Sequence, residues 1–199
     1  MKIGDKVNYK NYEWFVTKIE DEKVTLMMAD RMSDEDIEEL FYEKGMRDSD
    51  NNICFDKETN DWKDSYIRKV LNERFINKLN KQDLNEMTIN YAEDEYTTDY
   101  VRIPSLKECR ELPKEILTNK DIFWLINRGC YRKDIYNWFS ASAFAFIYSS
   151  GYAGYYYGFR AVLAVICVNK SALEKKTTYM TIKEIEEKLN IENLVIKGE

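Results

Sequence analysis

The chain has 199 residues, 44% of them hydrophobic and 33% charged, with a net charge of −6 and no histidine. This length, combined with few Gly and Pro residues, is typical of one globular domain and argues against a disordered or fibrous chain. The negative charge argues against nucleic-acid binding, and the lack of histidine removes the commonest general base and metal ligand. The longest apolar run, residues 161–168, is too short to cross a bilayer, so we expect no membrane segment.

The first predicted element is an antiparallel hairpin near the N-terminus. Residues 7–30 alternate β-branched and aromatic side chains, and the polar sequence "EDEK" at 20–23 interrupts them. We expect Trp14, Val16 and Ile19 to face the core. No apolar stretch of the kind found in secretory signals precedes this hairpin, which favours a cytoplasmic location.

Four further segments predict amphipathic helices. Ser33, Ser105 and Thr181 each stand three residues before an acidic residue, which is the spacing of a capping box, and a fourth helix begins at Ser65. Apolar residues recur at helical spacing behind each of these positions. The last helix and a following strand-like sequence predict a small helix–strand appendage at residues 169–199.

The acidic loop 48–61 raises the question of a calcium site. Asp48, Asp50 and Asn52 occupy the first three ligand positions of an EF-hand loop. Ile53 then stands where that loop needs glycine, and the last position lacks its glutamate. A solvated loop is therefore the favoured interpretation, and we predict neither a metal nor a cofactor.

The four cysteines do not predict a catalytic or metal site. Cys54, Cys109, Cys130 and Cys167 have no CxxC spacing, which favours reduced and mostly buried thiols over a zinc cluster. Without histidine, a nucleophile would need a carboxylate or a lysine as its base, and the spacing shows no such constellation. We therefore expect a protein that is not an enzyme.

The segment 135–168 has a single charge, Arg160, and alternates as strands do, with glycines at 151, 154 and 158 between them. In "SASAFAFIY", residues 140–148, a period of two places three alanines on one face and larger or polar residues on the other. The isolation of Arg160 predicts a buried cation with a paired acceptor.

The second face and the tyrosines that follow it combine Tyr, Ser, Gly and Ala, the mixture that antibody loops use for binding. The predicted ligand-binding residues are Ser140, Ser142, Phe144, Phe146, Tyr148, Tyr152, Tyr155, Tyr156 and Tyr157. Burial of Phe144 and Phe146 in the core fits their pattern equally well, whereas the tyrosine hydroxyls favour a surface.

Several segments, taken in order, resemble a domain family of unknown function from bacteria and their phages. They are "IGDKVNYKNYEWFVTKIEDEKVTLMM", "DWKDSYIRKVLNERFINKLNKQDLNEM", "YVRIPSLKECREL" and the pair "NWFSASAF" and "GFRAVLAV". The resemblance covers residues 1–168. The Gly158-Phe159-Arg160 ending is also similar to C-type-lectin-like domains, including formylglycine-generating-type enzymes and the variable proteins of diversity-generating retroelements.

This resemblance implies an α+β, C-type-lectin-like domain over 1–168, in which a fixed scaffold carries variable ligand-binding residues. The residues that it assigns to the scaffold are Trp14, Trp62, Arg68, Trp138, Gly158 and Arg160. The enzyme branch finds no support, because its paired active-site cysteines have no counterpart here.

We therefore expect a non-enzymatic binding protein of phage or mobile-element origin, cytoplasmic or virion-associated, with a protein or glycan partner. A second hypothesis is a phage-encoded intracellular inhibitor of a host defence system that mimics nucleic acid. The acidic helix 34–43 supports this alternative, although a solvated helix face is the simpler explanation of its charge.

Overall fold

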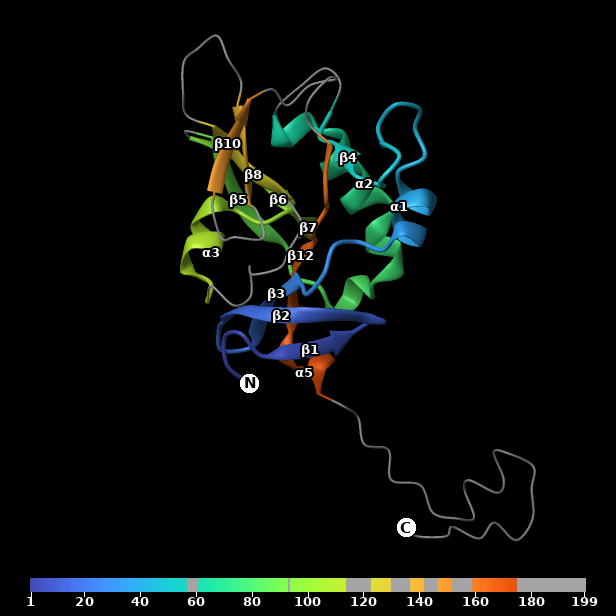
Figure 1. The fold of residues 1–199 in the computed structure, drawn as a ribbon. Helices are drawn as coiled ribbons and strands as arrows, with labels where there is room; N and C mark the ends of the chain where they lie inside the picture. The colour runs from blue at the N-terminus through green and yellow to red at the C-terminus, as the bar shows by residue number, and fades with distance from the viewer. Residues whose placement is uncertain are drawn as a thin grey trace, which may run out of the picture.

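The computed structural model describes residues 1–56, 61–92, 94–113, 123–129, 137–141, 147–151 and 159–174. Its largest element is a five-stranded sheet with the order β1-β2-β3-β12-β7 (Figure 1). The strands are β1 (Lys6–Tyr9), β2 (Tyr12–Ile19), β3 (Lys23–Met28), β12 (Val165–Asn169) and β7 (Val101–Arg102). The neighbours in this sheet are antiparallel, and β12, from near residue 165, lies between the N-terminal strand β3 and the short β7.

Three smaller sheets and several helices surround this sheet. The strands are β8 (Phe123–Gly129), β9 (Asn137–Ala141) and β10 (Ile147–Gly151) in one sheet, β4 (Ile53–Cys54) with β11 (Phe159–Arg160), and β5 (Met87–Ala92) with β6 (Glu95–Asp99). The helices are α1 (Asp34–Leu40), α2 (Tyr66–Glu73), α3 (Leu106–Glu111), α5 (Lys170–Leu173) and the 3₁₀ turns η1 (Trp62–Asp64), η2 (Phe75–Lys78) and η3 (Lys81–Asp83).

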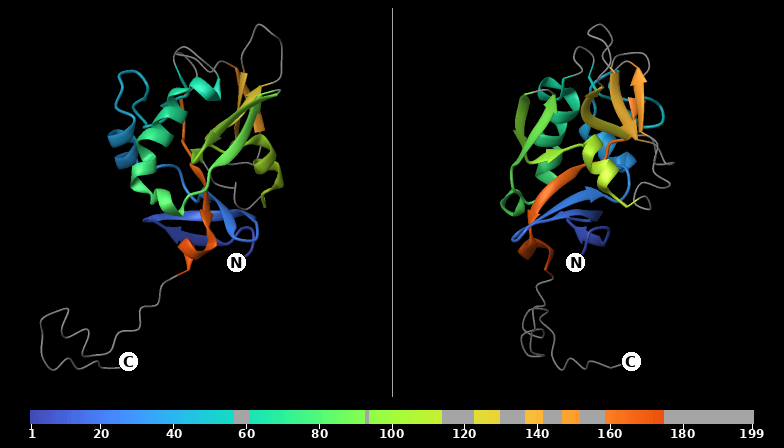
Figure 2. Two further views of the ribbon diagram at one scale, coloured as in Figure 1. Left: turned by 180° about the vertical axis from the view of Figure 1, so that it is seen from behind. Right: turned by 90° about the vertical axis from the view of Figure 1, so that its left-hand side faces the viewer.

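These elements form a mixed α+β domain, as expected. Helices α1 and α2 lie on one side of the molecule, and the β8–β9–β10 sheet lies with α3 on the other (Figure 2). The named strand pairs are all antiparallel. In the described part of the chain, no helix has the length and apolar character needed to cross a membrane.

The predicted N-terminal hairpin is a three-stranded meander. The turn at 20–22 was expected, but a second turn at Lys10 and Asn11 separates β1 from β2. Both residues have positive φ, 51° and 67°, which is the backbone of a type I′ turn. Such turns usually carry Asn-Gly or Asp-Gly, so the Lys-Asn pair gave no recognisable turn signal.

A β-bulge in β2 determines which residues of this strand face the core. Val16 pairs with Leu26, but the register shifts at Thr17, so that Lys18 pairs with Thr25 and Ile19 with Val24. The bulge therefore places Ile19 on the same face as Val16, although the two positions are three residues apart. Ile19 packs against the core as expected, and Lys18 faces the other side of the sheet.

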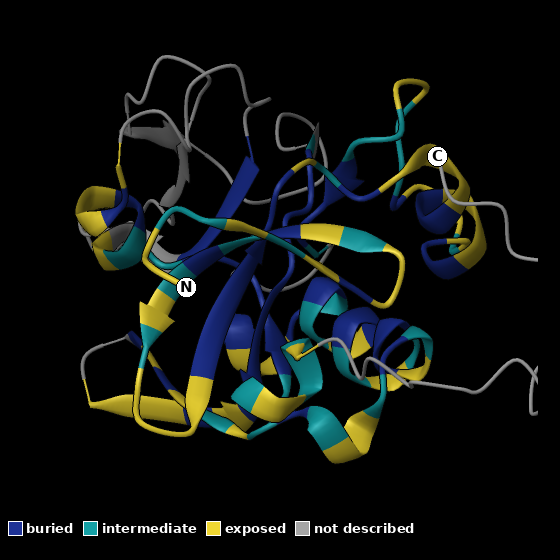
Figure 3. Ribbon diagram, turned by 90° about the horizontal axis from the view of Figure 1, so that it is seen from below, coloured by how far each residue is buried: buried dark blue, intermediate teal, exposed yellow. Residues whose placement is uncertain are grey.

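The core contains three fully buried tryptophans, and each indole N–H is satisfied. Trp14 donates to the carbonyl of Tyr9 at 3.0 Å, and Trp124 donates to that of Ile53 at 2.7 Å. Trp62 donates to the carboxylate of Asp99 at 2.9 Å. Figure 3 shows the buried strands passing through the middle of the domain. Trp14 and Trp62, two residues of the predicted scaffold, are thus part of the core.

The serine caps predicted from the sequence are present. Ser33, Ser65 and Ser105 each accept a hydrogen bond from the backbone N–H three residues later, at the start of α1, α2 and α3. Ser105 forms a complete capping box with Glu108. Satisfying these N–H groups stabilises helices of only six to eight residues, which are marginal on their own.

The loop expected at 47–61 and the appendage expected at 169–199 differ from the structure or are described only in part. The loop expected at 47–61 contains the strand β4, whose Ile53 and Cys54 are buried and pair with β11. In the segment expected as an appendage, α5 packs against β1 and β12, and the Lys170 N–H donates to the Glu22 carbonyl. The helix and strand predicted beyond it lie outside the described residues.

A buried carboxylate, Asp99, connects β6 to the start of α2. It is 3% exposed and accepts hydrogen bonds from Trp62, from Thr97 at 2.9 Å and from the Arg68 guanidinium at 2.8 Å. One turn later, the Asn72 amide lies against β7. It donates to the Val101 carbonyl at 2.7 Å and accepts the Val101 N–H at 3.1 Å, so it takes the place of a neighbouring strand.

A second polar contact connects the segment that follows α1 to α2 and its C-terminal residue Arg74. Arg74 and the Tyr66 hydroxyl both donate to the Glu43 carboxylate, and Arg74 also lies over the Tyr42 ring, 4.1 Å from its centroid. The Arg74 guanidinium, helped by Tyr66, holds the pKa of Glu43 at about 2 against the opposing effect of partial burial.

We expect Asp99→Ala to lower the free energy of unfolding by about 3 kcal/mol or more, because it leaves two buried donors and a guanidinium without their acceptor. Urea denaturation measures this loss. Asp64→Ala is the matched control, because Asp64 is exposed and has no hydrogen bond or ion pair among the described residues. Equal midpoints for the two variants would contradict the role of Asp99.

We expect the stabilising effect of Arg74 to depend on pH. The depressed pKa of Glu43 contributes stability that is complete above the unfolded value of about 4.5 and is lost as the pH falls toward 2. The stability difference between wild type and Arg74→Met should therefore shrink over this range. Lys69→Met, an exposed change on the same helix, should show a difference that stays constant. A constant difference for Arg74→Met would contradict the prediction.

Candidate functional site

The segment predicted to bind a ligand contains two strands in place of one. The alternation over 140–148 predicted a continuous strand, but β9 ends at Ala141 and β10 begins at Ile147, and the two are antiparallel neighbours. The period of two is therefore broken within the segment. Ser140 and Tyr148 remain together nonetheless, because they are direct register partners in the hairpin.

The structure places three of the predicted residues on the hairpin. Trp138 and Ser140 lie in β9 and Tyr148 lies in β10, with Trp138 opposite Ser150. Strand β9 also pairs with β8, where Trp124 is the register partner of Ser140. The other predicted binding and scaffold residues of this segment lie outside the described residues: Ser142, Phe144, Phe146, Tyr152, Tyr155, Tyr156, Tyr157 and Gly158.

Arg160 connects this region to the core. It lies in β11, opposite Ile53 of β4, and its guanidinium is 6.0 Å from the ring centroid of Trp124. Phe55 packs against the same ring at a centroid distance of 5.5 Å. Arg160 is half-buried, less than we expected, and this burial lowers the pKa of its guanidinium.

The described thiols are unsuited to nucleophilic chemistry. Cys54, Cys109 and Cys167 are buried thiols, and Cys130 lies outside the described residues. Burial raises the pKa of Cys109 to about 12 and also raises that of Cys167. Since the thiolate is the reactive form, both side chains are thiols at neutral pH and act as packing groups.

The described part of the acidic loop does not form a cation site. Asp48 accepts the backbone N–H groups of Asp50 and Asn52, both at 2.9 Å, and the Asn52 amide at 3.2 Å. These bonds use the carboxylate oxygens within an Asx-type loop. No group of three or more potential metal-binding residues occurs among residues that the structure describes.

The acidic helix α1 carries mostly paired carboxylates. Asp36 and Glu39 both contact the Lys78 ammonium, Asp34 contacts Arg31 at 3.1 Å, and Glu38 lies 3.7 Å from Arg47. This pairing compensates much of the negative charge that made the helix a candidate for imitating a phosphate backbone.

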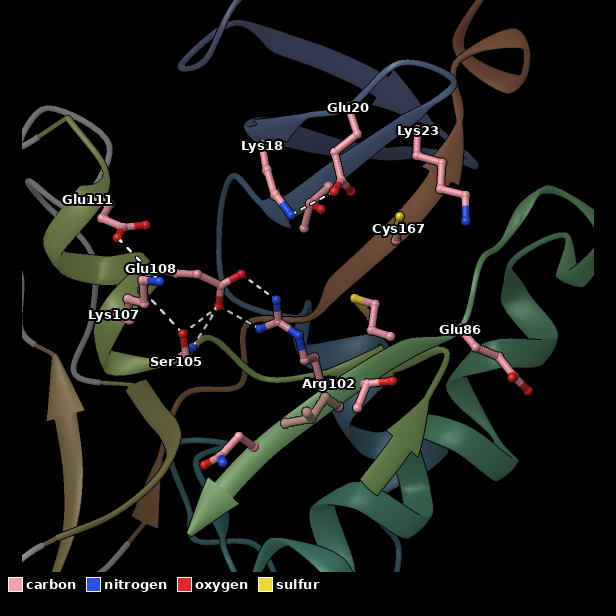
Figure 4. Close-up of a pocket in the computed structure, with 15 residues that line it drawn as sticks. Lys18, Glu20, Lys23, Glu86, Arg102, Ser105, Lys107, Glu108, Glu111 and Cys167 are labelled. Atoms are coloured by element: carbon pink, nitrogen blue, oxygen red, sulfur yellow. Dashed lines mark hydrogen bonds and ion pairs between the residues drawn. The ribbon is translucent and has the colours of Figure 1, made fainter. Parts of the chain in front are cut away.

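A pocket of about 430 Å³ lies on the face of the five-stranded sheet that carries Lys18 (Figure 4). Its floor is a row of register partners, Lys18, Thr25 and Cys167, from β2, β3 and β12. Helix α3 forms one wall, with Ser105 and Glu108 among its residues, and residues 86–90 of β5 and the preceding turn form the other.

A buried ion pair fixes the α3 wall. Arg102 of β7 donates to both carboxylate oxygens of Glu108, and the Ser105 N–H and hydroxyl each donate to Glu108 at 2.9 Å. Burial alone would raise the pKa of Glu108, but Arg102 and the Ser105 hydrogen bonds together lower it. With this many donors, Glu108 holds α3 against β7 and is not a free acid or base.

Sequence patterns did not predict this pocket. Its residues come from four separate parts of the chain, 18–25, 86–90, 102–111 and Cys167, and none of these stretches contains a chemical motif. The only local signal was the Ser105–Glu108 capping box, which predicts a helix start and not a cavity.

Comparison with known proteins does not assign the chain to a family. No family model matches it, and neither a curated protein nor a solved structure shows a significant match.

We expect Arg160→Met to lower the free energy of unfolding by about 1–2 kcal/mol, because the Trp124 ring loses a partly buried cation. Urea denaturation tests this. Arg110→Met on α3 is the control, since Arg110 is exposed. Arg160→Lys should recover part of the loss. An unchanged denaturation midpoint for Arg160→Met would contradict the predicted structural role of Arg160.

Proposed function

We propose that this protein is a non-enzymatic ligand-binding protein whose residues 139–157 contact a protein or glycan partner. The observation that carries the proposal is the place of the β9–β10 hairpin. Its sequence has no charged residue, and β10 is the outer strand of the β8–β9–β10 sheet, with β9 as its one neighbour among the described strands.

The chemistry of this segment supports the proposal. Tyrosine offers a large amphipathic contact area at a low cost in conformational entropy, and serine and glycine adapt to different hydrogen-bonding partners. An outer strand also presents backbone N–H and C=O groups, to which an extended segment of a partner adds by β-augmentation. The two contributions act together on a hairpin that carries Ser140 and Tyr148 in register.

We also propose that the domain is C-type-lectin-like, of phage or mobile-element origin, and that it acts in the host cytoplasm or on the virion. The support is the order of the motifs described above, ending at Gly158-Phe159-Arg160, in a chain with antiparallel sheets and short helices. The alternative, an intracellular inhibitor that mimics nucleic acid, has less support because four carboxylates of α1 are paired with cations.

The test is a set of single Tyr→Ala variants at Tyr148, Tyr152 and Tyr156, compared with wild type on a glycan array and in pull-downs from host lysate. At least one variant should bind ~30-fold more weakly, as expected for a hot spot of about 2 kcal/mol, with an unchanged melting temperature. Tyr96→Ala is the matched control, because Tyr96 is 58% exposed on β6, outside the segment.

Two results would contradict the proposal. The first is that the three tyrosine variants melt at lower temperature and the remaining folded protein binds normally, which would make these rings part of the core. The second is that wild type binds no glycan on the array and that no protein is captured by both wild type and the Tyr96→Ala control.

A further inference from the structure

Most of the charged side chains that line the pocket on the five-stranded sheet are paired with one another. Its lining includes four cations and four carboxylates: Lys18, Lys23, Arg102, Lys107, Glu20, Glu86, Glu108 and Glu111. Three ion pairs account for six of them, Lys18 with Glu20 at 2.8 Å, Arg102 with Glu108, and Lys107 with Glu111 at 3.9 Å. Lys23 and Glu86 remain.

Lys23 is the lining cation outside the three ion pairs, although Lys18 and, to a smaller extent, Lys23 both lower the pKa of Glu20. In the part of the chain that the structure describes, no carboxylate lies within ion-pair distance of its ammonium. Glu86 likewise lies outside these three ion pairs. A lysine left unpaired beside three paired cations in one pocket is a group available to a ligand.

The directions of the side chains favour an anion in the pocket. Lys18 and Lys23 extend from the β2–β3 hairpin into the pocket with Glu20 between them, whereas Glu86 and Glu111 lie at opposite margins (Figure 4). Below Lys23, the floor consists of Thr25 and Cys167, both uncharged. On the hairpin side of the pocket, two lysines therefore accompany one carboxylate, Glu20, although the lining as a whole is neutral.

The facing wall supplies hydrogen-bonding groups. Thr88 and Asn90 of β5 line the pocket and are exposed. A hydroxyl and an amide opposite an ammonium are a common arrangement for holding the oxygens of a carboxylate or a phosphate. The cavity volume of about 430 Å³ falls within the usual range for small-molecule sites, roughly 300–1,000 Å³.

We propose that this pocket binds a small molecule through an anionic group, a carboxylate or a phosphate, placed against Lys23, with its remaining part over Thr25 and Cys167. None of the lining residues belongs to β9 or β10, so this site is separate from the proposed hairpin surface and stands independently of it.

The experiment is an NMR titration of ¹⁵N-labelled protein with inorganic phosphate and, separately, with succinate, each against sodium chloride at equal ionic strength. Saturable shifts confined to the amides of the pocket, including Thr25 and Cys167, are expected for at least one probe. The probe that saturates at lower concentration identifies the anion chemistry. Lys23→Gln should weaken this binding at least fivefold. Lys69→Gln, an exposed lysine on α2 that does not line the pocket, should leave it unchanged.

Three results would overturn the proposal. Shifts that grow linearly and equally with phosphate, succinate and chloride would show only ionic screening. Saturable binding that Lys23→Gln and Lys69→Gln weaken equally would mean that net charge, not Lys23, attracts the anion. Shifts at the pocket on titration with glycylglycine amide, a monocation, but with neither anion would assign the site to a cation at Glu86. Thermal melts verify that both variants are folded.

Discussion

The carboxylate of Asp99 accepts hydrogen bonds from Trp62, Thr97 and Arg68 although it is only 3% exposed. A buried carboxylate is costly unless its oxygens are satisfied, so these three donors fix the position of α2 relative to β6. Asn72, one turn further along α2, then satisfies the outer edge of β7. A strand of two residues is thereby held in the five-stranded sheet, which its own pairing with β12 would not secure.

The position of β7 in turn builds the pocket. Arg102 lies on the same face of the sheet as Cys167, because its register partner Val165 is two residues from Cys167, and its ion pair with Glu108 fixes α3 beside it. On the same face, the bulge at Thr17 turns Lys18 away from the core and into the row with Thr25 and Cys167. The pocket is therefore a consequence of two backbone features, a bulge in β2 and a short β7, and not of a sequence motif.

Local signals in the sequence predicted local structure well. The caps at Ser33, Ser65 and Ser105 were recognisable because the acceptor and the N–H are three residues apart. Strand β4 was missed because Ile53 and Cys54 pair with residues more than 100 positions later. The I′ turn at Lys10 was missed for lack of glycine. The separation of β9 from β10 was missed because small and large residues alternate without interruption in the sequence 140–148, although the two strands are antiparallel.

The core strands and the β9–β10 hairpin differ in how they are held, and this difference allows one domain to combine a fixed core with a variable binding surface. Strand β12 has neighbours on both sides and is buried from Val165 to Val168, so packing constrains its residues apart from Cys167, which lines the pocket. Trp124, Phe55 and Arg160 hold the base of the neighbouring region through contacts with the core. The β9–β10 hairpin is joined to the rest of the domain through the backbone pairing of β9 with β8. Under the proposed function, substitutions at residues 139–157 alter what is bound, whereas substitutions at the Trp124 base or along β12 alter whether the domain folds.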